Sequence, residues 1–170
     1  MNDAELRQQL EQVHADSFGW AMTCCDRDRD NAEEVLQTVY LAVLDGRARY
    51  DARSSFRTWL FGVIRRTAAS EQRRTWLRQL LLVRDGDRLI PDAPPSPDAE
   101  AERESSRVGL QLALARLATR QRQVLHLVFY QDLTLSEAAV VMGVTVGSAR
   151  THYARGKARV AALLGHAEPR

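Results

Sequence analysis

Four of the five prolines in this 170-residue chain fall within seven consecutive positions of one stretch, residues 84–107. The same stretch carries seven acidic and four basic residues and few large apolar ones. Such a composition cannot bury enough apolar surface to offset the entropy lost on ordering, so we predict a flexible linker there. The linker divides the chain into one unit over residues 1–83 and a second over residues 108–170.

Both units are predicted to be helical, because apolar residues recur at the 3.6-residue spacing of one helix face. Sustained period-2 alternation, which is typical of strands, is not found. With 45% apolar residues, the chain has enough hydrophobic material for packed cores. The sequence therefore predicts an all-α fold of two small helical domains joined by a flexible Pro- and acid-rich linker.

The distribution of apolar residues also bears on location. No apolar run approaches the ~18 residues that a membrane-spanning helix needs. The first residues alternate charged and apolar types where a signal peptide would have an uninterrupted apolar core. We therefore expect no membrane insertion and a cytoplasmic location.

One predicted helix of the first unit, starting at Asp30 or Asn31, has two distinct faces. Its buried stripe consists of apolar residues: Val35, Leu36, Val39, Tyr40, Val43 and Leu44. A second row at i, i+3, i+4 and i+7 mixes polar groups with one leucine: Glu34, Gln37, Thr38 and Leu41. This row fits a partner surface, but an ordinary solvated face with one exposed leucine is also common. Periodicity alone leaves both interpretations open.

Charge is segregated along the chain although the net charge is only +2. Residues 1–34 carry nine acids and three arginines, whereas residues 47–78 carry nine arginines and two acids. Aromatic residues are interleaved with these arginines: Tyr50, Phe56, Phe61 and Trp76. Arginines neutralise phosphates and aromatic rings stack on unpaired bases, so the segment indicates nucleic-acid binding. Phe56 and Trp59 are expected in the core. The alternative is that all of these aromatic residues belong to the core and that the arginines only confer solubility.

The second unit contains a helix-turn-helix pattern over residues 134–160. Thr134 and Glu137 form an S/T-x-x-E capping box that starts a short helix. Gly143 ends it, because glycine accepts the positive φ of a tight turn, and Thr145 can cap the next helix. The outward residues of that second helix are small or cationic at its start: Gly147, Ser148, Arg150, Thr151 and Arg155. This arrangement suits insertion into the major groove; a three-helix bundle with a solvated basic face is the alternative.

Residues that could perform catalysis or bind metal are scattered. The four histidines, at 14, 126, 152 and 166, show no metal-ligand spacing, and we find no Gly-rich phosphate loop. The adjacent Cys24 and Cys25 suit neither a zinc site nor a disulfide framework and are expected to be buried, inert thiols. We therefore predict no catalytic residue, no cofactor and no metal, and a protein that is not an enzyme.

Three segments together resemble the extracytoplasmic-function (ECF) sigma factors of bacterial RNA polymerase. They are NAEEVLQTVY (31–40), FRTWLFGVIRRTAASEQRR (56–74) and LARLATRQRQVL…LTLSEAAVVMGVTVGSARTHYARGKARV (114–160). The resemblance implies that the first unit binds the clamp of core RNA polymerase and the melted minus-ten promoter element. It implies that the second unit reads the minus-thirty-five element as duplex and contacts the polymerase flap. An anti-sigma factor that clamps both units is also implied.

Carried over by position, the resemblance assigns three groups of residues. Those that resemble the clamp-contacting face are Glu34, Gln37, Thr38 and Leu41. The predicted minus-ten residues lie in the loop that holds a flipped base and on the helix beside it: Tyr50, Arg53, Ser54, Ser55, Arg65, Arg66, Arg73 and Arg74. The predicted minus-thirty-five residues are Thr145, Gly147, Ser148, Arg150, Thr151 and Arg155.

The chain departs from the family pattern at three positions. Arg66 stands where asparagine is usual, and Ser70 where aspartate is usual. Because asparagine's paired donor and acceptor are replaced by donors only, an unusual minus-ten preference is expected. Ala118 replaces a proline common at a helix start. The main alternative function is a helix-turn-helix regulator that acts without core polymerase, which would have no reason to carry the Gln37 to Leu41 face.

Overall fold

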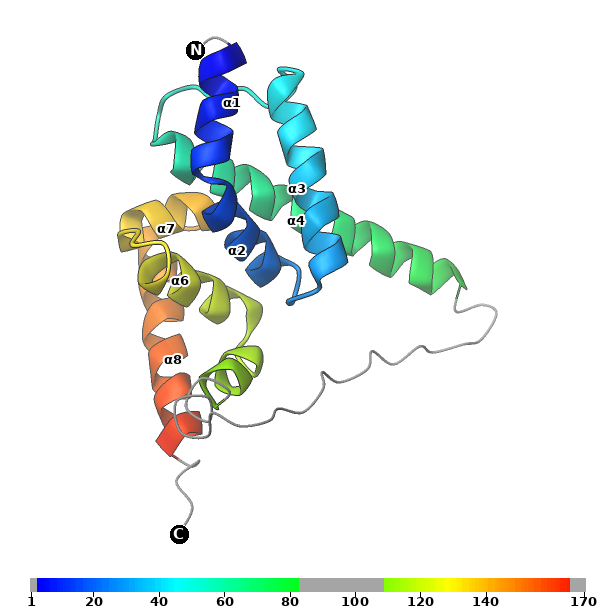
Figure 1. Cartoon of the computed structure of the whole chain (residues 1–170). Helices are drawn as coiled ribbons and strands as arrows, with labels where there is room; N and C mark the ends of the chain where they lie inside the picture. The colour runs from blue at the N-terminus through cyan, green and yellow to red at the C-terminus, as the bar shows by residue number, and fades with distance from the viewer. Residues whose placement is uncertain (1–2, 83–108, 166–170) are drawn as a thin grey trace, which may run out of the picture.

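A computed structural model of the chain describes residues 3–82 and 109–165, and within these ranges the secondary structure is helical, without strands (Figure 1). The all-α prediction is confirmed. The first unit contains α1 (Asp3–Gln12), α2 (His14–Cys24), α3 (Arg29–Leu44) and α4 (Phe56–Leu82). The second contains a helical segment over 109–115 followed by α6 (Thr119–Phe129), α7 (Leu135–Met142) and α8 (Val146–Gly165). The predicted linker, 84–107, lies outside the described residues.

Helix α3 begins slightly earlier than predicted. Asp28 is the N-cap, and its carboxylate accepts a hydrogen bond from the Asn31 N–H at 3.0 Å. The prediction of Asp30 or Asn31 as the start was therefore wrong, because several capping residue types stand close together here. The predicted stripe does face the core: its four aliphatic members from Val35 to Val43 are buried, and Tyr40 and Leu44 pack against them partly buried.

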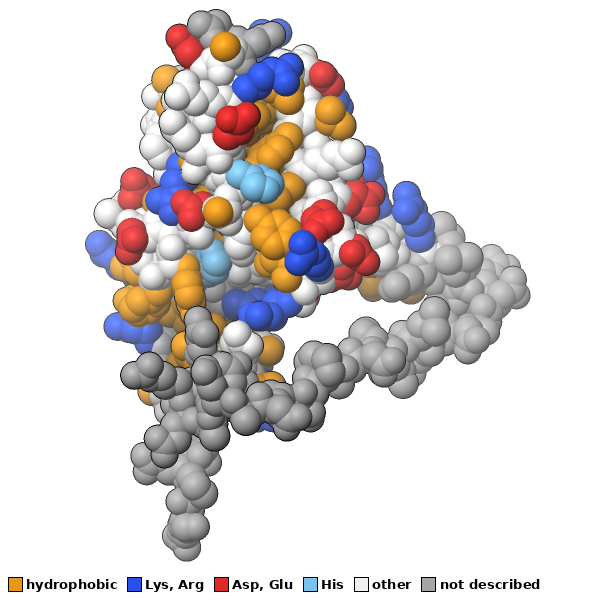
Figure 2. Space-filling model, viewed as in Figure 1, with side chains coloured by type: hydrophobic (Ala, Val, Ile, Leu, Met, Phe, Trp, Pro, Cys, Tyr) orange, Lys and Arg blue, Asp and Glu red, His pale blue; other side chains and the backbone are white. Residues whose placement is uncertain are grey.

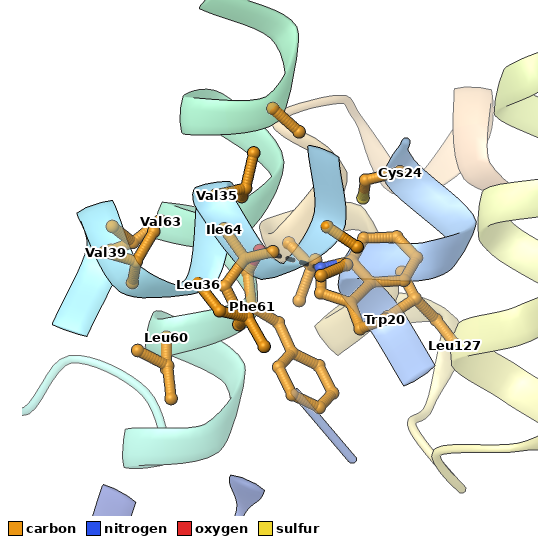
Figure 3. Close-up of a cluster of buried hydrophobic side chains, with 14 of the residues drawn as sticks. Trp20, Cys24, Val35, Leu36, Val39, Leu60, Phe61, Val63, Ile64 and Leu127 are labelled. Carbon is orange, nitrogen blue, oxygen red and sulfur yellow. Dashed lines mark hydrogen bonds between the residues drawn. The ribbon is translucent and has the colours of Figure 1, made fainter. Parts of the chain in front are cut away.

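The core of the first unit is centred on Trp20 of α2. Its side chain is fully buried, and the indole Nε1 donates to the Phe61 carbonyl at 2.9 Å (Figure 3). Phe61 is itself fully buried, so it has no surface on which an unpaired base could stack. Phe56 is buried as expected, whereas Trp76 is 60% exposed near the end of α4. The aromatic residues of the basic segment therefore divide between core and surface.

The helix-turn-helix forms as predicted. Thr134 and Glu137 make both hydrogen bonds of the capping box at the start of α7. Gly143 adopts the left-handed conformation, with φ at 62°. The Thr145 hydroxyl accepts from the Ser148 N–H at 3.1 Å and so caps α8. Ala149 is fully buried, which directs the opposite face of α8 outward.

The two units pack against each other. Helix α6 lies against α2, and α7 lies against α4. Leu127 of α6 packs beside Trp20, and one cluster of buried apolar residues continues through both units (Figure 3). We call this contact between α2 and α4 on one side and α6 and α7 on the other the seam. Within the described ranges, no helix is both long enough and apolar enough to cross a membrane.

Candidate nucleic-acid and partner interfaces

The predicted partner row on α3 is exposed along its whole length: Glu34, Gln37, Thr38 and Leu41. Leu41 leaves 49% of its surface open to solvent, although the other side of the helix is core. An open groove of about 550 Å³ runs beside it and is lined by apolar side chains that include Phe18, Tyr40 and Leu41. Figure 2 shows hydrophobic side chains gathered in a stripe on this face. The row and the groove together form a surface suited to a protein partner.

The loop before α4 is held by its own side chains. The Tyr50 hydroxyl donates to the Ser54 carbonyl at 2.6 Å, and the Ser55 hydroxyl accepts from the Thr58 N–H at 3.1 Å, capping α4. Ala52 has a φ of 57°, an uncommon conformation for a residue with a side chain. The loop therefore has a defined shape, in which Arg53 is exposed.

A hollow of about 460 Å³ opens beside this loop, with Arg49, Tyr50 and Trp59 among the residues that line it. The rings of Tyr50 and Trp59 lie 5.4 Å apart between centroids. Sequence reasoning assigned Trp59 to the core, but only part of its ring is buried. A large aromatic can pack on one edge and remain open on the other, which apolar periodicity does not reveal. The hollow offers aromatic surface next to the cationic side chain of Arg49, as an unpaired base requires.

Helix α4 carries the predicted arginines, and its second half extends past α3 (Figure 1). Arg66, Arg73 and Arg74 are exposed, and Arg74 also pairs with Glu71 at 3.0 Å. Arg65 differs, because it is partly buried and its Nε donates to the Val141 carbonyl of α7 at 3.0 Å. The structure thus brings most of the cationic side chains to the surface and directs Arg65 into the seam.

The six predicted duplex-reading residues are all exposed, at the N-cap or in the first half of α8: Thr145, Gly147, Ser148, Arg150, Thr151 and Arg155. Two of the hydroxyls are engaged locally. Thr145 donates to the Ser148 hydroxyl at 3.0 Å, and Thr151 donates to the Gly147 carbonyl at 3.0 Å. The two arginines are the long side chains of this surface, and α7 lies between α8 and α4. The two cationic surfaces are therefore on separate elements.

Both cysteines are unpaired and buried, as expected. Burial raises the pKa of the Cys24 thiol, and it raises the pKa of the Cys25 thiol to about 11 with the help of Asp28 and Asp26. Both groups are therefore protonated near neutral pH, where the reactive thiolate is scarce.

Comparison with known proteins assigns both units. Residues 10–78 match the family described as Sigma-70 region 2, and residues 107–160 match Sigma-70, region 4. The chain is 30% identical over 154 residues to the ECF RNA polymerase sigma factor SigC of Mycobacterium tuberculosis, covering 88% of this chain and 77% of SigC. It is 32% identical over 120 residues to SigF of Caulobacter vibrioides, and the match covers 71% of this chain and 63% of SigF.

Solved structures that share the fold include two complexes. The sigma factor RpoE of Bartonella quintana, in complex with the anti-sigma factor NepR, matches with a TM-score of 0.74 at 18% identity, over 96% of this chain and 99% of RpoE. CnrH, in complex with the cytosolic domain of CnrY, matches with a TM-score of 0.66 at 22% identity, over 98% of this chain and 92% of CnrH.

An all-α chain that carries regions 2 and 4 in this order is a transcription-initiation factor of the sigma-70 class. The chain belongs to the ECF RNA polymerase sigma factors. It binds core RNA polymerase and directs promoter recognition. The alternative of a regulator that works without polymerase is therefore wrong.

Proposed function

We propose that the exposed row on α3 is the surface that docks on the polymerase clamp, with Glu34, Gln37, Thr38 and Leu41 in contact. The observation that carries this assignment is the exposure of Leu41 at 49% on a helix whose opposite face packs against the core. An apolar side chain in a polar row contributes to association when a partner removes it from water. The groove beside it extends the apolar area.

The minus-ten element is assigned to the loop from Tyr50 to Ser55 and to the arginines of α4. The hollow beside the loop supplies aromatic surface for a flipped base, and the exposed arginines of α4 supply charge for the backbone. Arg66 presents donors only, so its base contacts require acceptors such as the guanine N7 and O6. This supports a minus-ten preference different from that expected with asparagine at this position.

The minus-thirty-five element is assigned to the start of α8. Its first turns are exposed and combine small residues with Arg150, a geometry that brings the helix close to base edges. The unit that carries α8 would also meet the polymerase flap. We place the domain boundaries at 1–83, 84–107 and 108–170, and the protein in the cytoplasm, acting without catalysing a reaction of its own.

Control by an anti-sigma factor completes the proposal. RpoE was solved with the anti-sigma factor NepR, and its fold matches this chain over nearly the whole length of both. A partner that contacts both units would compete with polymerase and promoter for the surfaces assigned above.

The docking surface is tested by the double variant Gln37→Ala, Leu41→Arg. Both side chains are exposed, so helicity and thermal unfolding should stay unchanged while co-purification with core polymerase is lost. Leu112→Arg is the matched control, since Leu112 is 57% exposed in the other unit and should be tolerated. Undiminished co-purification of the double variant would show that polymerase docks elsewhere.

Promoter selection is tested by transcription in vitro on a genomic library, with core polymerase and the full chain, followed by mapping of start sites. A shared pair of upstream elements among the mapped starts is the expected result. Starts that are the same with and without the chain would contradict the assignment of promoter reading to it.

A further inference from the structure

Arg65 supplies a hydrogen-bond donor to the last turn of α7. The final carbonyls of a helix have no partner within it. The Ala139 and Val140 carbonyls accept from the backbone N–H groups of the following turn, at 3.1 and 3.2 Å. The Val141 carbonyl instead accepts from Arg65 Nε at 3.0 Å. The cation also lies at the negative end of the helix dipole, where positive charge is stabilising.

Gly143 is shaped for the same contact. Its φ of 62° suits the turn, and a Cβ atom at this position would lie 3.1 Å from Arg65 Nη2. That distance is tighter than ordinary van der Waals contact, so a side chain at this position would require the end of the Arg65 guanidinium to move by a few tenths of an ångström. Glycine therefore serves both the turn and the approach of Arg65 from the other unit.

The rest of the seam is built like a protein interior. The Thr23 hydroxyl lies 3.0 Å from His126 Nδ1, and the His126 ring lies 5.6 Å from the Trp20 ring between centroids. Arg122, with 13% of its side chain exposed, pairs with Asp26 of the first unit. Gln123 reaches the Cys24 sulfur, at 3.9 Å. Polar pairs around an apolar centre make the closed arrangement a specific contact between the units.

We propose that Arg65 is an intramolecular latch, which holds the helix-turn-helix unit closed on the first unit and is withheld from promoter DNA until the seam opens. Arg66, the next residue, is exposed and is not held in this way. A ligand that binds the open arrangement better shifts the chain toward it, so release of the latch and contact of Arg65 with DNA are coupled. The DNA half of this proposal rests on the proposed function, whereas the latch is a property of the unbound chain.

Cys24 provides a native probe of the seam. It is buried beside Gln123 of α6, whereas Cys25 faces a different hollow formed by α3 and α4. Opening the seam should expose Cys24 alone, while global unfolding should expose both thiols. Burial raises the pKa of Cys24, and the charge of Arg65 opposes that rise. Removing the Arg65 charge would therefore raise the pKa of Cys24 further, which by itself slows alkylation. A faster reaction in an Arg65 variant thus reports opening of the seam.

The experiment measures iodoacetamide alkylation of each cysteine in the full-length, unbound protein, with the two sites separated by fragmentation in the mass spectrometer. Arg65→Met keeps the length of the side chain and removes its donors. Loss of a hydrogen bond from a charged group should favour the open arrangement. The ratio of the Cys24 alkylation rate to the Cys25 alkylation rate should therefore rise ~10-fold. Gly143→Asn, which tolerates the left-handed backbone but adds a Cβ, should raise the ratio as well. Arg66→Met is the control and should leave it at the wild-type value.

A wild-type ratio in both Arg65→Met and Gly143→Asn would overturn the latch. No polymerase or DNA is present, so this result is independent of the transcription assay that tests the proposed function. The coupling to DNA is tested with Gly143→Asn and a short single-stranded DNA of mixed sequence. Its affinity should rise in proportion to the open fraction; an affinity equal to that of the wild type would show that closure does not withhold Arg65.

Discussion

Arg150 occupies the part of α8 from which a side chain reaches base edges, because the N-terminal residues of a recognition helix enter the major groove. It is exposed, and it lies one turn beyond the capping residue Thr145. We expect Arg150→Ala to cost ~1–3 kcal/mol of discrimination at its matching base pair in the minus-thirty-five element. Open-complex formation on promoters mutated one position at a time measures this loss.

Arg155 is the comparison for that variant. It lies more than a turn further along α8, where a phosphate contact is expected, so Arg155→Ala should weaken all promoters alike and reduce the salt dependence. If Arg150→Ala leaves upstream discrimination unchanged, α8 is not the reading helix and the helix-turn-helix serves packing.

His126 makes stability depend on pH. Its ring is packed between Trp20 and Tyr130, with Thr23 and Gln131 at its nitrogens. Burial lowers its pKa to about 4, and nearby Asp16 only partly opposes this. In the unfolded chain the pKa is ~6.5, so below that pH the unfolded state takes up a proton that the folded state refuses. The free energy of unfolding should therefore fall as the pH drops from 6.5 toward 4.

The size of this effect is on the order of 3 kcal/mol at most, from the difference between the two pKa values. Urea denaturation of the wild type and of His126→Gln between pH 7 and pH 4.5 checks it. Carboxylates titrate equally in both proteins, so the difference between the two curves isolates the histidine. Parallel curves would show that His126 is protonated with its ordinary pKa in the folded protein.

At the scale of single elements, the helix-turn-helix was predictable because its determinants are local. The capping box, the left-handed Gly143 and the Thr145 cap all act within a few residues of each other. The buried stripe of α3 was predictable for the same reason. The start of α3 was not, because Asp28, Asp30 and Asn31 can each cap a helix and only the structure shows that Asp28 does so.

The capping box of α7 is tested by Thr134→Ala. The Thr134 hydroxyl accepts from the Glu137 N–H at 3.2 Å, and Glu137 Oε2 accepts from the Thr134 N–H at 2.9 Å. Loss of the hydroxyl should lower the free energy of unfolding by ~1 kcal/mol. Ser136→Ala, at an exposed position on the same helix, is the control and should change stability by less than ~0.5 kcal/mol. Equal effects of the two variants in chemical denaturation would mean that the box contributes nothing measurable.

At the scale of the whole molecule, sequence reasoning identified two units but not how they meet. Thr23 and His126 are 103 positions apart, and Arg65 and Val141 are 76 apart. No local sequence pattern predicts either pair, because residue types such as threonine and histidine on separate helices are compatible with many different neighbours. Arg65 illustrates this. Its charge and its neighbouring arginines predicted contact with DNA, whereas its hydrogen bond to a backbone carbonyl follows only from the way the two units pack. The assignment of residues to polymerase and DNA remains a prediction for the same reason.

The continuous core makes a final prediction about cooperativity. Leu127 belongs to the second unit but is fully buried in the cluster that contains Trp20. Leu127→Ala should therefore lower the stability of the whole chain by ~2–5 kcal/mol. All three tryptophans, at 20, 59 and 76, lie in the first unit, so their fluorescence reports that unit while far-UV circular dichroism reports both. The two midpoints should coincide in the wild type and shift together in the variant.

The exposed Val140 supplies the matched control for Leu127. It is 60% exposed on α7, so Val140→Ala should move neither midpoint by more than ~0.5 kcal/mol. If Leu127→Ala instead shifts the circular dichroism transition and leaves the tryptophan transition in place, the two units unfold independently. The seam would then contribute little to stability, and the closed arrangement would not persist in the unbound chain.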